Sequence, residues 1–82
     1  MGYKELDGKT LTLFAANGTE MYSTPVHLDQ DGWLQATKWN DTFYSEIETA
    51  LYCANEGDAE WGENIDYDED YNETVYGYYV FH

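Results

Sequence analysis

Carboxylate groups are the reactive side chains that this sequence supplies in quantity. It contains seventeen Asp and Glu residues, and its formal net charge is -14 at pH 7. Nine of these acids fall within the eighteen residues from Glu56 to Glu73, whereas the only Lys or Arg residues are Lys4, Lys9 and Lys38. Clustered carboxylates can bind metal ions, act as acids and bases, or create a field that attracts a charged macromolecule. Each of these roles makes its own demand on the neighbouring residues.

The series Asp66, Asp68 and Asp70 has the spacing that opens a calcium-binding loop, D-x-[DN]-x-[DN]-G-x5-E. The rest of the motif is missing. Tyr71 stands where the sharp turn needs glycine, and Gly77 stands where the bidentate glutamate belongs. The sequence therefore predicts no specific calcium site in the acidic run.

Zinc binding and catalysis find no better support. His27, His82 and Cys53 are the only nitrogen and sulfur ligands, and they lack the paired spacing of a zinc site. A nuclease or phosphatase needs cations beside the phosphate, and no Lys or Arg follows Lys38. Neither a GxSxG elbow nor a Walker loop is present. We expect no enzymatic activity, no metal and no cofactor.

The composition argues against two kinds of partner and suggests a cellular compartment. Nucleic-acid and anionic membrane binding both draw their affinity from Lys and Arg, so neither is expected. No apolar run approaches the roughly 20 residues that span a bilayer, and the first residues do not resemble a signal peptide. Cys53 is the only cysteine, which suits a reducing compartment. We expect a cytoplasmic protein, in the bacterial host if a phage encodes it.

The first half of the chain alternates as β-strands do. This pattern predicts strands over about 9–16 and 19–24, joined at Asn17-Gly18 by a two-residue type I′ turn. Such a turn would set Phe14 opposite Met21. Pro25 is expected to end the second strand or mark its edge. A third strand over about 33–38 follows a turn of Asp29, Gln30, Asp31 and Gly32, which completes a meander.

The period then changes to that of a helix over about 41–55, capped by Asn40 or Asp41 and stopped by Asn55 and Gly57. Its apolar stripe includes Phe43, Ile47 and Leu51, and Tyr52 points the opposite way. Residues 56–73 are expected to form an acidic loop, and residues 74–81 an aromatic strand. The order β-β-β-α-β predicts one small α+β domain over residues 1–82. Phe14, Trp33 and Trp39 are expected to lie in the core, and Trp61 is expected to hold the acidic loop against the domain.

The size of the charge calls for a function, since a magnitude of about 2 to 8 keeps a small domain in solution. Acids at alternate positions, such as Asp58 and Glu60, or Asp66, Asp68 and Asp70, project to one side about 6 to 7 Å apart if the chain is extended, a spacing similar to that of phosphates along a nucleic-acid strand. We therefore expect a stoichiometric inhibitor that mimics DNA and occupies the basic channel of a nucleic-acid-binding protein. The candidate partner-binding residues are Glu46, Glu48, Tyr52, Glu56, Asp58, Glu60, Glu63, Asp66, Asp68, Glu69, Asp70 and Glu73.

Several targets fit this expectation. In charge and length the chain is similar to the DNA mimics of phages and mobile elements, which block host-defence proteins. CRISPR effectors are favoured because they expose several basic channels, so the first expectation is an anti-CRISPR protein. Restriction enzymes and DNA-repair enzymes are alternatives of the same physical class. An acidic adaptor or chaperone that binds a basic protein without imitating nucleic acid is an alternative of a different class.

Overall fold

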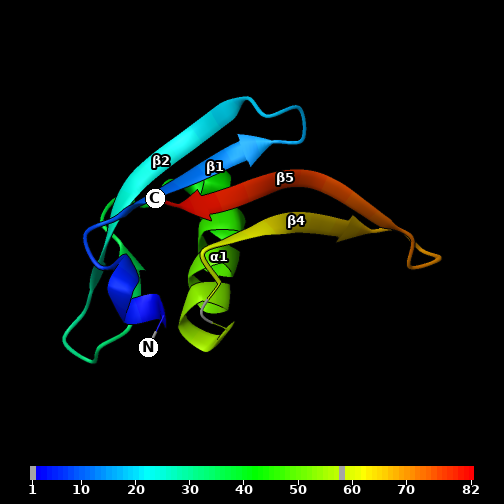
Figure 1. The fold of residues 1–82 in the computed structure, drawn as a ribbon. Helices are drawn as coiled ribbons and strands as arrows, with labels where there is room; N and C mark the ends of the chain where they lie inside the picture. The colour runs from blue at the N-terminus through cyan, green and yellow to red at the C-terminus, as the bar shows by residue number, and fades with distance from the viewer. Residues whose placement is uncertain (1, 58) are drawn as a thin grey trace.

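The computed structural model describes residues 2–57 and 59–82, which form an α+β domain (Figure 1). Five antiparallel strands make one curled sheet in the order β3-β2-β1-β5-β4, and the helix α1 covers one of its faces. The α+β class predicted from the sequence is confirmed. The elements in chain order are η1 (Gly2–Leu6), β1 (Thr10–Ala15), β2 (Glu20–Leu28), β3 (Leu34–Ala36), η2 (Asp41–Phe43), α1 (Tyr44–Gly57), β4 (Trp61–Tyr67) and β5 (Glu73–Phe81).

The β1–β2 hairpin forms where it was predicted, but its turn differs. The Ala15 N–H donates to the Thr19 carbonyl and the Gly18 N–H donates to the Ala15 carbonyl, which makes a three-residue loop. Gly18 has a positive φ of 88°, the geometry of a turn followed by a bulge. The predicted type I′ turn is wrong, because it needs positive φ at Asn17 as well. Phe14 consequently pairs with Glu20, not with Met21.

The strand β2 continues through Pro25 to Leu28, so the prediction that it ends near residue 24 is wrong. The Pro25 carbonyl accepts a hydrogen bond from the Thr37 N–H, on the side of the strand away from β1. The N–H that proline lacks would point to that same side, so no bond to β1 is lost. This lets β2 pair first with β1 and then, from Val26 onward, with β3.

The predicted helix corresponds to η2 followed by α1, so it begins at Asp41 as predicted and ends two residues later than predicted, at Gly57. The Asn40 side chain accepts a hydrogen bond from the Thr42 N–H, which caps η2 ahead of α1. Ile47 and Leu51 are buried against the sheet, and Phe43 packs on their flank, stacked on Tyr22. Asn55 was predicted to stop the helix, but its side chain instead bonds to both backbone groups of Leu34, tying α1 to β3.

The acidic run is not the loop that was predicted. Residues 61–67 form β4, the edge strand that pairs with β5 along its whole length. Acids are poor strand formers, and the sequence between Trp61 and Tyr67 has little alternation. Pairing with the aromatic strand β5 overrides that weak local preference. The strand predicted over 74–81 is confirmed and begins one residue earlier.

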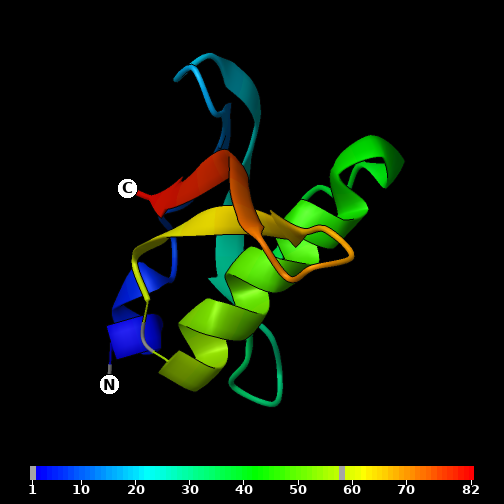
Figure 2. The same cartoon turned by 90° about the vertical axis from the view of Figure 1, so that its right-hand side faces the viewer.

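The core lies between the sheet and α1, which crosses the sheet obliquely (Figure 2). Its buried members are Leu6, Leu11, Leu13, Val26, Leu34, Ala36, Ile47, Ala50, Leu51, Ala54, Tyr79 and Phe81. The expectation that Trp33 and Trp39 lie in the core is wrong, because their exposed fractions are 45% and 42%. Trp61, which was expected to hold an acidic loop against the domain, instead begins β4 and is 65% exposed. Phe14 is half-buried, on the face of the sheet that α1 leaves open. Short aliphatic side chains fill the narrow space under the helix, which leaves the large indoles at the surface.

Candidate partner-binding site

The β4–β5 hairpin extends well beyond the rest of the sheet. The strand β5 pairs with β1 from Gly77, which lies opposite Ala15, to Phe81. The part of β5 that precedes Gly77 pairs only with β4. Residues 65–76 therefore form a two-stranded projection, here called the distal ribbon (Figure 1). It accounts for the elongated shape of the molecule, whose principal extents are 41, 23 and 20 Å.

Asp68 holds the turn at the tip of the distal ribbon. Its side chain accepts hydrogen bonds from the backbone N–H groups of Asp70 and Asn72, each at 2.9 Å, and from the Asn72 side-chain amide at 3.1 Å. The bonds from Asn72 are the main reason that the pKa of Asp68 lies below its usual value. Asp68 thus has a structural role and is the least available of the ribbon acids for a partner.

The same turn occurs between β2 and β3. There the Asp29 side chain accepts hydrogen bonds from the backbone N–H groups of Asp31 and Trp33, and the bond from Trp33 is the largest cause of its lowered pKa. The two turns differ at their fourth position. Gly32 occupies it in one turn with a φ of 84°, and Tyr71 occupies it in the other with a φ of 61°. Among the described residues, Tyr71 is the only one other than glycine with a positive φ.

Replacing Tyr71 with glycine is expected to raise the free energy of unfolding by about 1 kcal/mol, because side chains with a Cβ are strained in this conformation. The ring is 83% exposed and loses little packing when it is removed. Urea denaturation would measure the change. The reciprocal variant Gly32→Ala, at a position with nothing within 4 Å of the new Cβ, should lose a similar amount. A less stable Tyr71→Gly variant would show that the ring stabilises the tip.

The acids of the ribbon are exposed but do not form the single row that the sequence suggested. Asp66 lies in β4, and Glu69 and Asp70 lie in the turn, where the chain reverses direction. The expectation that Asp66, Asp68 and Asp70 project to one side is wrong, because an extended strand ends at residue 67. The charge is instead spread over two strands and a tip. Glu63 and Glu73 complete this set.

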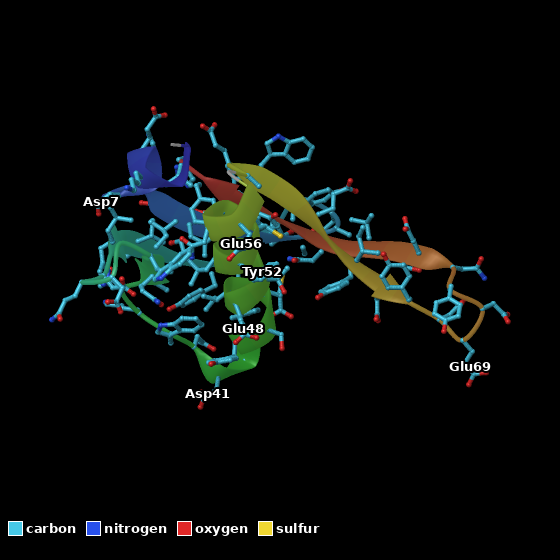
Figure 3. All side chains as sticks on the ribbon, turned by 90° about the horizontal axis from the view of Figure 1, so that it is seen from below. Asp7, Asp41, Glu48, Tyr52, Glu56 and Glu69 are labelled. Atoms are coloured by element: carbon cyan, nitrogen blue, oxygen red, sulfur yellow. The ribbon has the colours of Figure 1, made fainter. Side chains whose placement is uncertain are left out.

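The helix residues form a separate surface. Glu48, Tyr52 and Glu56 follow one another along the outer side of α1, and Glu69 lies far from them at the tip of the ribbon (Figure 3). Tyr52 is 67% exposed, as its predicted outward position requires. The structure therefore divides the candidate residues between the ribbon and the helix. Glu46 lies apart from both sets in a pocket described below, Glu60 lies just before β4, and Asp58 is outside the described residues.

Sequence reasoning missed an aromatic groove on the open face of the sheet. Its volume is about 490 Å³, and it lies beside Glu60. Residues of the paired strands β1, β4 and β5 line it: Phe14, Trp61, Tyr78 and Val80. The register places Phe14 opposite Tyr78 and Trp61 opposite Val80, which brings these side chains to one face. The repeated Asp-x-Asp pattern at residues 29 and 68 could have revealed the second turn, and with it the strand that carries Trp61.

The described residues offer no group of three or more His, Cys, Asp or Glu side chains arranged to hold a metal ion. No helix within residues 2–57 or 59–82 has both the length and the apolar character needed to cross a bilayer. Comparison with known proteins adds no relative, since no family model, no curated protein and no solved structure matches the chain.

Proposed function

We propose that this protein is an inhibitor that presents its acidic ribbon in place of nucleic acid and occupies the basic groove of a nucleic-acid-binding protein. The observation that carries the proposal is the distal ribbon itself, a narrow, exposed projection that concentrates acids and holds no lysine. A projection of this kind can enter a groove that the body of the domain cannot. The protein would act by occupancy, without chemistry of its own.

The charge density of the ribbon resembles that of a nucleic-acid strand. Six acids lie on or just before the projection: Glu63, Asp66, Asp68, Glu69, Asp70 and Glu73. At about 3.3 Å per strand residue they occupy roughly 20 Å along the ribbon, or about one charge per 3.3 Å, and one strand of DNA carries a charge about every 3.4 Å along the helix axis. A groove lined with Lys and Arg would meet a similar field in both cases.

The lysines lie away from the ribbon in the sheet. No lysine lies in α1, β4 or β5, whereas Lys38 lies two residues after β3, at the opposite edge. A molecule with one strongly negative side is steered toward a basic surface in a fixed orientation, and its association is fast at low salt. Tyr67 and Tyr71 add flat, exposed contact area between the acids.

The proposed target is a host-defence protein of bacteria, and a CRISPR effector is the first to test because it has several basic channels. Restriction and DNA-repair enzymes present the same kind of groove. The proposed setting is the bacterial cytoplasm. In each case the expected effect is loss of nucleic-acid binding by the target at equimolar inhibitor.

Neutralising three acids that lie on or just before the ribbon and lack a turn-stabilising role is expected to weaken target binding. The variant Glu63→Gln, Glu69→Gln, Asp70→Asn should associate several-fold more slowly with a purified effector at low salt, because rim charges act mainly on the on-rate. Surface plasmon resonance at increasing salt would measure it. Wild-type association should itself slow steeply as salt rises.

A matched control removes three charges elsewhere. The variant Glu5→Gln, Glu20→Gln, Asp31→Asn has the same net charge as the ribbon variant, but its changes lie outside β4, β5 and the turn between them. It should associate at a rate closer to that of the wild type. Equal rates for the two variants would show that only the total charge matters, and an unchanged ribbon variant would remove the ribbon from the mechanism.

The acidic adaptor remains a second candidate, favoured by the aromatic groove on the open face. A basic segment with apolar side chains could lie along Trp61 and Tyr78 while its cations contact Glu60 and Glu63. Competition separates the two functions. Excess duplex DNA or RNA should displace a mimic from its partner, whereas an adaptor should stay bound.

A further inference from the structure

A small pocket opens between the start of the helix and the sheet. Its volume is about 260 Å³, and its walls come from both layers of the fold: Phe14, Met21, Thr42, Phe43, Glu46, Asn64, Tyr76 and Gly77. Phe43 and Tyr76 contribute aromatic rings, and Glu46 contributes the one acidic side chain among these residues. The pocket is smaller than the roughly 300 to 1,000 Å³ of sites for whole small molecules. It has the dimensions for a single side chain.

The Glu46 carboxylate is incompletely satisfied. Its Oε2 atom is buried and accepts no hydrogen bond from the protein, and no other buried side-chain nitrogen or oxygen in residues 4–57 and 59–82 lacks a partner in this way. Glu46 lies in the first turn of α1, where the helix dipole favours an acid but supplies no donor to this oxygen. A buried carboxylate oxygen without a donor is costly, so a donor from outside the chain that reached this oxygen would be stabilising.

The surroundings of the pocket favour a cation. Burial is the main cause that raises the pKa of the Tyr76 phenol, and the charges of Glu46 and Asp66 add to it. The phenol therefore stays protonated at neutral pH, and Glu46 is the one residue with a carboxylate side chain among those that line the pocket. A metal ion would need about six oxygen ligands, and the described residues hold no such group.

We propose that this pocket receives an arginine side chain of the basic partner. A guanidinium group is planar, so it can lie against the rings of Phe43 and Tyr76 while it donates to the Glu46 carboxylate, once that side chain turns to present Oε2 to the pocket. It also keeps its charge when water is removed, unlike a lysine ammonium. This inference rests on the proposed function, which supplies the basic partner. It adds that one arginine of this partner binds in the pocket beside the ribbon.

The test uses N-acetyl-L-arginine amide as a probe of the full chain, followed by NMR in the amide and aromatic regions. We expect saturable shifts of Phe43, Tyr76 and Gly77 at millimolar probe. The citrulline analogue, which has the same shape without the charge, should cause none. Glu46→Gln should weaken binding about tenfold by removing the charge-assisted bond, and Glu5→Gln, a remote charge change, should leave it unchanged.

Three results would overturn the assignment: no shifts with the arginine probe, equal shifts with citrulline, or undiminished binding by a folded Glu46→Gln variant. The same spectra report whether each variant is folded. The ribbon variant described above should still bind the probe, because its three changes lie outside the pocket. A ribbon variant that loses target binding but still binds the probe would support the ribbon proposal independently of the pocket. A wild-type protein that binds its target but not the probe would overturn the pocket proposal alone.

Discussion

Replacing Leu51 with alanine is expected to lower the free energy of unfolding by about 2 to 5 kcal/mol, the usual range for removing a buried leucine side chain. Leu51 is 5% exposed and belongs to the buried face of α1 together with Ile47 and Ala54. These residues are the main apolar contact between the helix and the sheet. The cavity left by the missing methyl groups cannot be refilled by the alanines on either side.

Chemical denaturation monitored by circular dichroism would measure this loss. The neighbouring substitution Tyr52→Ala provides the control, because Tyr52 is 67% exposed on the opposite side of the same helix. It should change stability by less than about 0.5 kcal/mol. A Leu51→Ala variant as stable as the control would mean that α1 is not packed on the sheet through this face.

The variant Gly77→Ala should be destabilised by about 1 to 3 kcal/mol, as is typical when a well-packed interior is forced to accept an extra carbon. A Cβ at this position would lie 2.6 Å from the Phe14 backbone carbonyl oxygen. Backbone atoms of β1 cannot rotate away as a side chain can, so the two strands would have to separate. Gly77 is also where β5 leaves β1 and the distal ribbon begins.

Thermal and urea unfolding of this variant should be compared with Gly57→Ala, where a new Cβ meets nothing within 4 Å. We expect the Gly57 variant to match the wild type or exceed it slightly, since alanine is the better helix former. If Gly77→Ala were equally harmless, β1 and β5 could not approach each other as closely as the structure has them.

The parts of the fold predicted from sequence are those with strong local signals. The helix follows from apolar residues three and four apart, and the meander follows from alternation interrupted by Gly18 and Gly32. The strand β4 was missed because its acids disrupt alternation and because Tyr71 hides a turn that glycine usually marks. Its pairing with β5 is a tertiary effect that a local pattern does not contain.

The candidate site also combines features that local sequence signals predict with features that only the fold creates. Exposure of the ribbon acids and of Tyr52 could be predicted, because charge and helical periodicity determine them locally. The structural role of Asp68 and the buried oxygen of Glu46 could not, since each depends on atoms brought close by the fold. The same holds for the groove at Trp61, whose walls come from three strands.

Because β4 is an edge strand, its acidic side chains have a second effect, on contacts between copies of the chain. In the described residues β4 pairs only with β5, so one side of its backbone is open to another strand. An open edge of this kind invites two copies of a chain to join into a continuous sheet, and charged side chains prevent it. When two ribbons approach edge to edge, Glu63 and Asp66 bring like charges together. The residues proposed to draw this protein to a basic groove would therefore also oppose pairing between copies, and a variant without them is expected to self-associate more readily.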